Sequence, residues 1–406
     1  MSDYSLNTST KSSINEVAYV STFPPKKCGI ATFTSDLVNS IAHLNRLNDQ
    51  TIISIHDHSL LKPTYERNVY AVSRDSIEDY MLMADFLNHS NVSVVNIQHE
   101  FGIFGGESGE YICEFMDKLK KPIATTLHTV LPNFDAKTEE VFNRIVQQSA
   151  AVVVLNETTS ELLQQKGVSP KKIKVIPHGC PDLPMVSSKE VKPALGLKNK
   201  IVLSTFGLLS KGKGIEHVIQ ALPEIIKKEP RVIYYVLGVT HPNVKISEGE
   251  NYRKTLLKMA KKLGVGSHVR FLNRFLSKLE LYNYLQATDI YITPYPSPNQ
   301  VSSGTLSYAL AAGKAVVSTP YLHAKEALSA GRGLFCKFDD SASIAKEVIK
   351  IIENKSLRRS LEKNAYSYSR KFVWPSVAKK YLALFDELTE QSREENRNSE
   401  SYQFLS

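Results

Sequence analysis

Short apolar runs alternate with amphipathic stretches along the chain from Glu16 onward. In the first half, apolar runs between turn-forming residues predict strands, at Glu16–Thr22, Thr51–His56, Val92–His99, Pro122–His128, Ala151–Leu155 and Ile173–Pro177. Between them, apolar residues recur every three or four positions and predict helices, at about Thr34–Leu47, Ser76–Asn88, Gly109–Leu119, Thr138–Gln148 and Thr159–Lys166. Apolar strands linked by helices predict a parallel sheet that helices cover on both faces.

The alternation stops between Cys180 and Lys200, where prolines and serines replace the apolar period and indicate a linker. The pattern then restarts, with strands predicted at Ile201–Leu209, Val232–Leu237, Val269–Leu272, Ile290–Pro294, Ala315–Thr319 and Leu334–Phe338. Helices are predicted at Ile215–Lys227, Asn251–Leu263, Lys278–Gln286, Thr305–Ala312, Ser343–Glu353 and Leu357–Leu388. This order predicts two Rossmann-like α/β domains, each a doubly wound parallel sheet.

The patterning divides the chain into domains and tails. The polar ends, residues 1–15 and 390–406, are expected to be disordered tails. Between them lie an N-terminal Rossmann-like domain (16–182), a linker (183–199), a C-terminal Rossmann-like domain (200–356) and C-terminal helices (357–389). Because open parallel sheets bind ligands beyond the carboxyl ends of their strands, we expect the domains to face each other across a ligand-binding cleft.

The composition, 42% hydrophobic and 22% charged over 406 residues, is that of a folded globular protein. It excludes collagen-like and disulfide-scaffold classes. Four scattered cysteines (Cys28, Cys113, Cys180 and Cys336) predict neither a disulfide framework nor a zinc site and fit a reducing compartment. The polar N-terminus lacks the apolar core of a signal peptide, and no apolar run reaches the ~18 residues that span a bilayer. We therefore expect a cytoplasmic protein.

The net charge of +9 permits attraction to phosphates or to an anionic membrane surface. The lysines are spread along the chain and no nucleic-acid-binding motif occurs, so no nucleic-acid partner is expected. Peripheral contact with the inner face of a membrane stays open, because basic residues can touch anionic lipids there. The sequence does not indicate an oligomeric state.

Two strand-to-helix loops carry glycines suited to anions. The loop Phe23–Phe33 holds Gly29 before a helix N-terminus, whose unpaired N–H groups attract phosphate. An ordinary tight turn with positive φ at Gly29 is the alternative. The loop Ser210–Ile215 places Lys213 among glycines, which suits a diphosphate although the loop is no Walker motif. Its alternative is an exposed basic turn.

A third loop, Pro294–Gly313, follows a predicted strand and opens a helix of small residues. Its segment Ser302-Ser303-Gly304-Thr305 supplies the Ser/Thr cap and the glycine of a helix N-terminus that is ready for an anion. The alternative is an ordinary capped helix.

Taken together, these loops resemble those of retaining glycosyltransferases of family 4, which have the two-domain GT-B fold. The resemblance covers about Val17 to Leu388 and rests on several motifs in order, which are the loop of Gly29, Thr126–Thr129, Val175–Gly179, Phe206–Gly214 and Gln300–Pro320. No single motif is specific to the family, but their order and spacing are.

The resemblance implies that a nucleotide-sugar binds mainly to the C-terminal domain and the acceptor to the N-terminal domain. It makes Lys213 the residue that neutralises the diphosphate, has Gly29 present backbone N–H groups to the phosphates, and has His128 contact the transferring sugar. The catalytic set is then His128, Lys213 and Gln300, and the donor-binding set is Gly29, Gly207, Lys213, Ser303, Gly304, Thr305, Tyr308 and Glu326.

Three positions depart from the family pattern. Leu208 stands where the family usually has arginine, and Gln300 and Tyr308 stand at its two paired glutamates. Gln300 can still bond sugar hydroxyls, but Tyr308 cannot replace a carboxylate that bridges two ribose hydroxyls. We hypothesise that Glu326 takes part of that role.

The chemistry implied is electrostatic. A breaking glycosyl–phosphate bond leaves positive charge on the sugar and negative charge on the diphosphate, which Lys213, backbone amides and helix N-termini would stabilise. Asp-x-Asp, the usual carboxylate pair for a nucleotide-bound Mn²⁺ or Mg²⁺, does not occur in the sequence, which predicts a metal-independent reaction without a cofactor. Retention, by front-face attack with the leaving phosphate as base, is implied by the resemblance.

A further loop is predicted to bind the acceptor, a carbohydrate, lipid-linked or small molecule. It follows the strand Val92–His99 and collects His99, Glu100 and Glu107 with two phenylalanines, a mixture typical of sugar sites. In the alternative, the phenylalanines anchor the core and Glu107 begins a helix.

Two other functions fit the same scaffold. The first is a GT-B sugar phosphorylase that uses inorganic phosphate. The second is a catalytically silent nucleotide- or glycan-binding partner in polysaccharide synthesis, motivated by the departures at Gln300 and Tyr308. Stabilisation by nucleotides separates the transferase from the phosphorylase, and turnover separates both from the silent protein.

Overall fold

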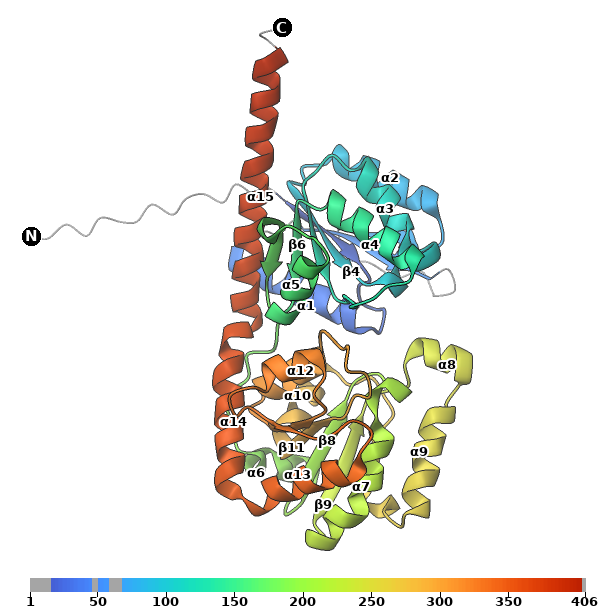
Figure 1. Ribbon diagram of the computed structural model, residues 1–406, viewed down its shortest axis with the longest axis vertical. Coiled ribbons are helices and arrows are strands. Elements are labelled where there is room, and N and C mark those ends of the chain that lie inside the picture. The colour runs from blue at the N-terminus through green and yellow to red at the C-terminus, as the bar shows by residue number, and fades with distance from the viewer. Residues whose placement is uncertain (1–15, 46–49, 58–67, 404–406) are drawn as a thin grey trace, which may run out of the picture.

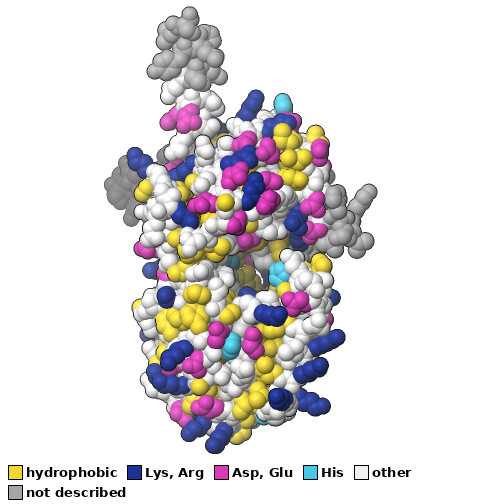
Figure 2. Space-filling model, turned by 45° about the vertical axis from the view of Figure 1, so that its right-hand side comes forward, with side chains coloured by type: hydrophobic (Ala, Val, Ile, Leu, Met, Phe, Trp, Pro, Cys, Tyr) yellow, Lys and Arg dark blue, Asp and Glu magenta, His cyan; other side chains and the backbone are white. Residues whose placement is uncertain are grey.

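The computed structural model describes residues 16–45, 50–57 and 68–403, which form two α/β lobes stacked along the long axis of the molecule (Figure 1). Figure 2 shows a hollow between the lobes. In the described part of the chain, both sheets are entirely parallel, with strand orders β3-β2-β1-β4-β5-β6-β7 and β10-β9-β8-β11-β12-β13. The predicted fold class, two doubly wound domains, is confirmed.

The N-terminal lobe carries a sheet whose strands are β1 (Val17–Ser21), β2 (Thr51–His56), β3 (Val69–Ser73), β4 (Val94–His99), β5 (Ile123–Leu127), β6 (Ala151–Val154) and β7 (Ile173–Val175). Its helices are α1 (Gly29–Asn45), α2 (Ile77–Asn88), α3 (Tyr111–Lys118), α4 (Ala136–Gln148) and α5 (Glu157–Gln165). Helices α2 to α5 bury apolar side chains on one face of the sheet, and α1 covers the other face.

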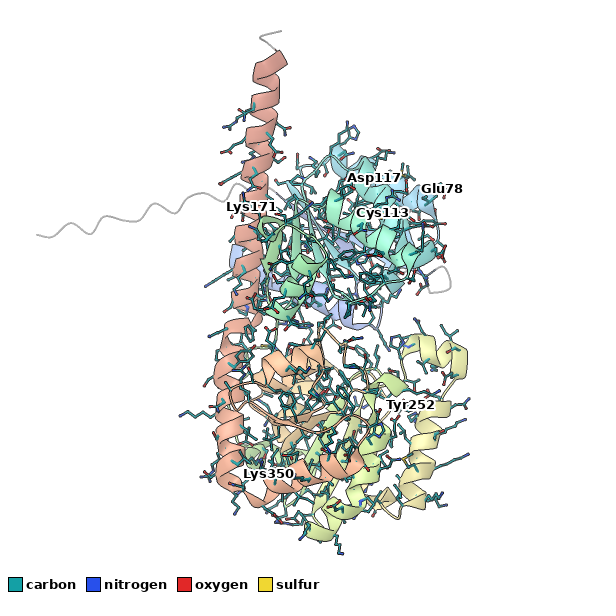
Figure 3. All side chains as sticks on the ribbon, in the orientation of Figure 1. Glu78, Cys113, Asp117, Lys171, Tyr252 and Lys350 are labelled. Carbon is teal, nitrogen blue, oxygen red and sulfur yellow. The ribbon has the colours of Figure 1, made fainter. Side chains whose placement is uncertain are left out.

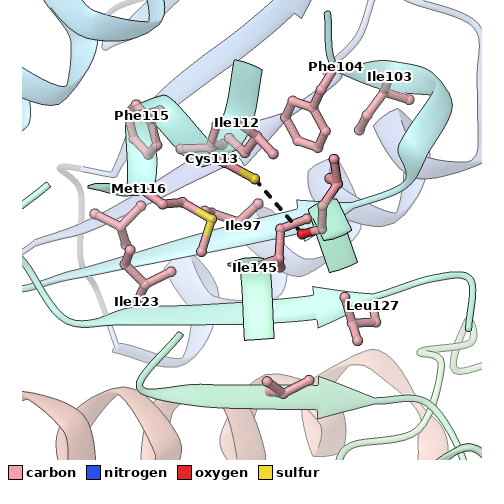
Figure 4. Packing of buried hydrophobic residues seen from close by; sticks show 14 of the residues in the cluster. Ile97, Ile103, Phe104, Ile112, Cys113, Phe115, Met116, Ile123, Leu127 and Ile145 are labelled. Atoms are coloured by element: carbon pink, nitrogen blue, oxygen red, sulfur yellow. Dashed lines mark hydrogen bonds between the residues drawn. The ribbon is translucent and has the colours of Figure 1, made fainter. Parts of the chain in front are cut away.

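Figure 4 shows the first of these cores around Cys113, whose Sγ lies 3.9 Å from the carbonyl oxygen of Val141 on α4. All four cysteines are unpaired, and three of them are buried. Burial raises the pKa of the Cys113 thiol to about 11. The three buried thiols, of Cys113, Cys180 and Cys336, are therefore packing groups rather than nucleophiles.

The C-terminal lobe carries β8 (Ile201–Phe206), β9 (Val232–Leu237), β10 (Val269–Leu272), β11 (Ile290–Thr293), β12 (Ala315–Ser318) and β13 (Leu334–Phe335). Its helices are α7 (Ile215–Lys228), α8 (Pro242–Glu248), α9 (Asn251–Lys262), α10 (Lys278–Ala287), α11 (Gly304–Ala311), α12 (Leu322–Ala327), α13 (Ser341–Glu353) and α14 (Lys355–Ser369). One face packs against α7, α9 and α13, and the other against α10, α11, α12 and α14.

The last helix, α15 (Trp374–Gln403), runs back along the N-terminal lobe (Figure 1). Its apolar residues from Trp374 to Leu388 join the core on the α1 side of the first sheet. Helix α15 therefore follows the C-terminal lobe in sequence but packs on the N-terminal lobe, and this return crossing ties the two lobes together.

Three features differ from the sequence expectations. The segment expected as a linker includes α6 (Ser188–Val191) and a 3₁₀ turn (Lys192–Leu195), which Asp289 holds to the second lobe through bonds from Ser188 and Lys192. Residues 390–403, expected to be disordered, continue α15, since Glu, Gln and Arg favour helix. Strand β3 was not predicted, although Val69–Val72 is an apolar run at the edge of the sheet. The expected N-terminal tail lies outside the described residues.

Basic side chains are distributed over both lobes. Lys171 and Lys350, labelled in Figure 3, lie on different lobes. Within the described residues, no helix is both long enough and apolar enough to cross a membrane.

Candidate active site

The C-terminal wall of the cleft is built around Lys213. A 3₁₀ turn (Lys211–Lys213) joins β8 to α7, and the Lys213 ammonium donates to the Tyr295 hydroxyl at 3.0 Å while lying 4.3 Å from the centre of its ring. Tyr295 follows β11 and is buried. Its hydroxyl lies 2.9 Å from Thr305 Oγ1, which lies 3.1 Å from Ser303 Oγ at the N-terminus of α11. The structure thus brings together three predicted residues through a tyrosine.

Two glycines shape this wall. Gly207 has φ +130°, and a Cβ there would lie 3.4 Å from Thr305 Cγ2 and 3.9 Å from Lys213 Cε. Gly214 has φ +61°, and a Cβ there would lie 2.1 Å from the carbonyl oxygen of Pro294. Only glycine lets the Lys213 turn and the Tyr295 loop approach this closely.

The charge of Lys213 is not compensated by an acid. Within the described residues, no carboxylate oxygen lies within 4.0 Å of its ammonium, whereas its neighbour Lys211 is paired with Glu248 at 3.5 Å. Burial alone would raise the pKa of Tyr295, but the Lys213 ammonium and bonds to Thr305 and Ser303 outweigh it and lower that pKa. A half-buried, unpaired ammonium beside hydroxyls suits a phosphate group.

The N-terminal wall carries His128, directly after β5. Its Nε2 lies 2.8 Å from Gln98 Oε1, and Phe33 of α1 meets its ring edge-on at 4.8 Å. The Ser302 hydroxyl of the opposite lobe donates to the His128 carbonyl at 3.2 Å. Close by, a Cβ at Gly304 would lie 2.7 Å from His178 Nε2, so the N-terminus of α11 meets both histidines.

The histidines at this interface are neutral at physiological pH. Burial lowers the pKa values of His128 and His323 to about 3, and it lowers the pKa of His178 as well. Neither His323 nor His178 therefore supplies a cation here. The charged group at the cleft is therefore Lys213 rather than a histidine.

Gly29 is the first residue of α1, and a Cβ there would meet no atom within 4 Å. It is not among the glycines with positive φ, so the tight-turn alternative is wrong. The Sγ of the preceding Cys28 accepts from the N–H of Ala31 at 3.3 Å. Gly29 therefore begins α1 with open space at the position that a side chain would occupy.

Tyr308 does not stand free in a donor site. It is buried, and its hydroxyl donates to Asp36 Oδ2 of α1 at 2.9 Å, while Lys278 pairs with the same carboxylate. Phe206 and Tyr282 lie against its ring. Tyr308 bridges the lobes in this structure, and the donor contact expected of it stays a prediction.

Glu326 also bridges the lobes. Its carboxylate accepts from the N–H groups of Glu157 and Thr158, at 3.3 and 3.1 Å, and from the Thr158 hydroxyl at 2.9 Å. It therefore caps α5 of the opposite lobe. The hypothesis that Glu326 takes part of the role of a ribose-binding glutamate stays a prediction, and in this structure its carboxylate is bonded to the opposite lobe.

Gln300 lies apart from the Lys213 cluster. Its side chain is exposed and donates to the Ser302 carbonyl at 2.7 Å, which folds it back on its own loop. Its carbonyl accepts from the N–H of His323 at 3.1 Å. The structure thus gives Gln300 a loop-shaping contact and does not bring it to Lys213 or His128.

The three residues predicted to bind the acceptor lie in different surroundings. His99 is fully buried against Phe101 and Phe104, with both ring nitrogens unpartnered, and burial lowers its pKa to about 3. Glu100 accepts from the Thr129 hydroxyl at 2.7 Å, and burial raises its pKa. Glu107 is exposed and begins a short 3₁₀ turn. Phe104 is a core anchor, so the alternative for this loop is correct there, and no shared site of His99, Glu100 and Glu107 forms.

A cavity of about 290 Å³ lies at the interface between the lobes, beside the junction of α14 and α15. His178, His323 and Glu326 line it, together with Lys371 and Lys380. Lys213 is not among its lining residues, so this cavity is separate from the cationic wall. In the part of the chain that the structure describes, no group of three or more His, Cys, Asp or Glu side chains is placed to hold a metal ion.

Both halves of the sequence match known families. Residues 63–182 match the family described as Glycosyltransferase Family 4, and residues 187–368 match the family described as Glycosyl transferases group 1. The division between the matches falls where the chain passes from one lobe to the other.

Proteins that are similar to this chain in sequence are named as glycosyltransferases. An uncharacterized glycosyltransferase of Methanocaldococcus jannaschii is 29% identical over 256 residues, 60% of this chain and 60% of that one. D-inositol 3-phosphate glycosyltransferase of Corynebacterium efficiens is 25% identical over 302 residues, 70% of this chain and 69% of that one. The match therefore spans three fifths of the first relative's length.

Solved structures share the fold. HepE of Anabaena, in complex with UDP and glucose, superposes with a TM-score of 0.74 at 16% identity, covering 92% of this chain and 99% of that one. Sucrose-phosphate synthase of Thermosynechococcus elongatus gives 0.73 at 15% identity, covering 93% and 99%. With both lobes matched in sequence and the architecture shared, the chain belongs to the GT-B glycosyltransferases of the family 4 type.

Proposed function

We propose that the protein is a retaining glycosyltransferase that moves a sugar from a nucleotide-sugar to a carbohydrate, lipid-linked or small-molecule acceptor without a metal ion. The observation that carries the proposal is the unpaired Lys213 ammonium, held by Tyr295 beside the N-termini of two helices, α7 and α11. Helix N-termini and a cation together favour a diphosphate. Family membership supports the reaction class.

The proposed step exchanges one bond for another at the anomeric carbon. The acceptor hydroxyl oxygen bonds to that carbon from the face that the diphosphate leaves, and the carbon–oxygen bond to phosphate breaks with its electron pair moving to the phosphate. The hydroxyl proton passes to the leaving phosphate oxygen. Lys213 stabilises the charge that develops there, which is the largest contribution an enzyme of this kind makes.

The N-terminal wall supports the sugar rather than the phosphate in this proposal. Because His128 is neutral, its ring interacts with a sugar hydroxyl through a hydrogen bond and not through a charge. The N–H of Gly29, at the start of α1, is available to the phosphates from the N-terminal lobe.

Ligand-induced stabilisation tests the donor class. Because UDP is bound in the Anabaena HepE structure, UDP is the first nucleotide to test, followed by GDP, ADP and inorganic phosphate. A ligand at 100 times its Kd stabilises the folded state by about 2.7 kcal/mol. A shift with a nucleotide supports the transferase. A shift with phosphate alone favours the phosphorylase. The observation that favours this second function is that Glu326 and Tyr308 bond residues of the opposite lobe, Thr158 and Asp36, rather than standing free to bind a ribose.

Turnover tests the reaction itself. Nucleotide-sugars are incubated with a panel of acceptors, with and without EDTA, and the product anomer is assigned by NMR. We expect transfer, or slow donor hydrolysis, that EDTA does not reduce, with the anomeric configuration kept. Loss of activity in EDTA would contradict metal independence, and an inverted product would contradict retention. Absence of any turnover would favour a silent binding protein.

A further inference from the structure

A chain of buried polar side chains crosses the N-terminal lobe and ends at His128. It begins on α15, where the Tyr381 hydroxyl lies 2.9 Å from Thr126 Oγ1 on β5. Gln98 of β4 donates from Nε2 to Thr126 Oγ1 at 3.3 Å and to Asn96 Oδ1 at 2.6 Å. Gln98 Oε1 then meets His128 Nε2 at 2.8 Å. All five side chains are buried, so each bond matters for folding and orientation.

The direction of the bonds that join Asn96, Gln98 and His128 follows from one backbone carbonyl. Asn96 Nδ2 lies 2.9 Å from the carbonyl oxygen of Ala124, which can only accept, so Asn96 Oδ1 faces Gln98. The amide nitrogen of Gln98 therefore points to Asn96 Oδ1, and its oxygen points to His128. Because that oxygen can only accept, the proton of the His128 ring is on Nε2.

The ring of His128 is then left with a lone pair on Nδ1. Among the described residues, Nδ1 has no hydrogen-bond partner, while the backbone of His128 is fixed on both sides, by the His99 carbonyl at 3.0 Å and by the Ser302 hydroxyl at 3.2 Å. The titratable groups that face the ring are His99 and His178, and burial lowers the pKa of each. In the part of the chain that the structure describes, no carboxylate is paired with this ring, and the nearby Glu100 bonds the Thr129 hydroxyl instead.

We propose that Gln98 is a positioning residue, which fixes His128 as the neutral Nε2–H tautomer so that Nδ1 accepts a hydrogen bond from a sugar hydroxyl in the cleft. The identity of that hydroxyl rests on the proposed function. The structural half of the inference, which is the tautomer of His128 and its fixing by Gln98, does not. The inference assigns Nδ1 of His128 the role of a hydrogen-bond acceptor toward the sugar. It excludes a role of the His128 ring as a general acid at neutral pH. Tyr381 extends the chain, so α15 supports the wall that receives the sugar.

NMR of the unliganded protein tests the structural half. The protein is labelled with ¹⁵N-histidine, the eleven histidines are observed by two-bond ¹H–¹⁵N correlation, and the His128 signals are assigned by their loss in His128→Asn. We expect the Nε2–H tautomer from about pH 5.5 to 8 without titration, since the ordinary imidazole pKa of about 6.5 is strongly lowered. An Nδ1–H tautomer, or titration near pH 6.5, would overturn the proposal whether or not the protein transfers sugar.

Variants test the functional half. Gln98→Leu removes the acceptor of Nε2–H, and we expect the Nδ1–H tautomer to appear and kcat to fall about tenfold, while the thermal shift caused by the nucleotide is kept. The matched control is Thr125→Val, because Thr125 is equally buried on β5 and bonds only Ser149, at 2.7 Å. This control should lower stability and leave the His128 tautomer and kcat unchanged.

The remaining outcomes are also decisive. An unchanged kcat in Gln98→Leu with an altered tautomer would overturn the role of Nδ1, and an equal loss of kcat in both variants would reduce Gln98 to a purely structural residue. If Gln98→Leu does not fold, Tyr381→Phe shortens the chain at its far end. A smaller kcat loss with a kept tautomer is then expected, and no loss at all would remove α15 from the positioning chain.

Discussion

The two walls of the cleft are built from the same kind of fold and carry different chemistry. On the C-terminal wall, Lys213 keeps an ammonium without a carboxylate partner among the described residues, surrounded by the hydroxyls of Tyr295, Thr305 and Ser303. On the N-terminal wall, burial makes His128 and His178 neutral. One wall therefore offers charge, and the other offers directed hydrogen bonds.

The difference follows from what surrounds each group. Lys213 lies on a turn before a helix and is half-buried, so water and hydroxyls can solvate its charge. His128 follows a central strand and is enclosed by Phe33 and a buried amide, where a second ring proton would be costly. A shared fold thus sets where a residue lies at the sheet edge, and local burial decides whether it is charged there.

Removing the charge of the C-terminal wall should have the largest effect. Lys213→Ala is expected to lower kcat/KM by about 30-fold or more, corresponding to about 2 kcal/mol, because a charge-assisted bond to the leaving group is lost. Initial rates with a saturating acceptor measure it. The matched control is Lys211→Ala, two residues away on the same turn, whose ammonium is exposed and paired with Glu248. Equal losses in both variants would show that only the overall basicity of the turn matters.

Weakening the connection between the walls should have an intermediate effect. In Glu326→Gln, an amide replaces the carboxylate that accepts from the N-terminus of α5. We expect kcat/KM to fall about fivefold, since a carboxylate at a helix N-terminus contributes about 1 kcal/mol. Small-angle scattering should show a larger radius of gyration without ligand.

The control for that prediction is Glu157→Gln, which removes a negative charge from the same helix end without touching the other lobe. Glu157 is exposed in the first turn of α5, and its side chain makes no bond to Glu326. We expect kcat/KM within twofold of the parent protein. A matching loss in both variants would assign the effect to the stability of α5 rather than to lobe closure.

The sequence predicts the parts of this comparison that depend on local pattern. Buried parallel strands are apolar throughout, so most strands were placed from their runs, and the loops after them located Lys213, Ser303 and His128. Strand β3 was missed although Val69–Val72 is an apolar run, and in the structure this edge strand buries only Val72. Local pattern therefore gives the sheet and the loops that face the cleft.

The contacts between lobes could not be predicted, because their partners are distant in sequence. Tyr308 and Asp36 are 272 residues apart, and Glu326 and Thr158 are 168 apart. Tyr295 lies in the Pro294–Gly313 loop, but nothing in the sequence marks it as the residue that holds Lys213. Gln98 did leave a signal, since Asn96 and Gln98 are alternate polar residues within an otherwise apolar strand, which places both on one buried face.

The smallest effect is expected from the hydroxyl that lies between Lys213 and Thr305. Tyr295→Phe keeps a ring beneath the ammonium and removes the oxygen, so kcat/KM at pH 7 should change by about twofold. The lowered pKa of Tyr295 means that the parent protein forms a phenolate as the pH rises, and this anion offsets the Lys213 charge that the leaving phosphate needs. Activity should therefore decline at a lower pH in the parent than in Tyr295→Phe, which rate–pH profiles of both proteins measure. Coincident alkaline limbs would show that Tyr295 does not ionise in the working enzyme, and the charge of the C-terminal wall would then be independent of its tyrosine.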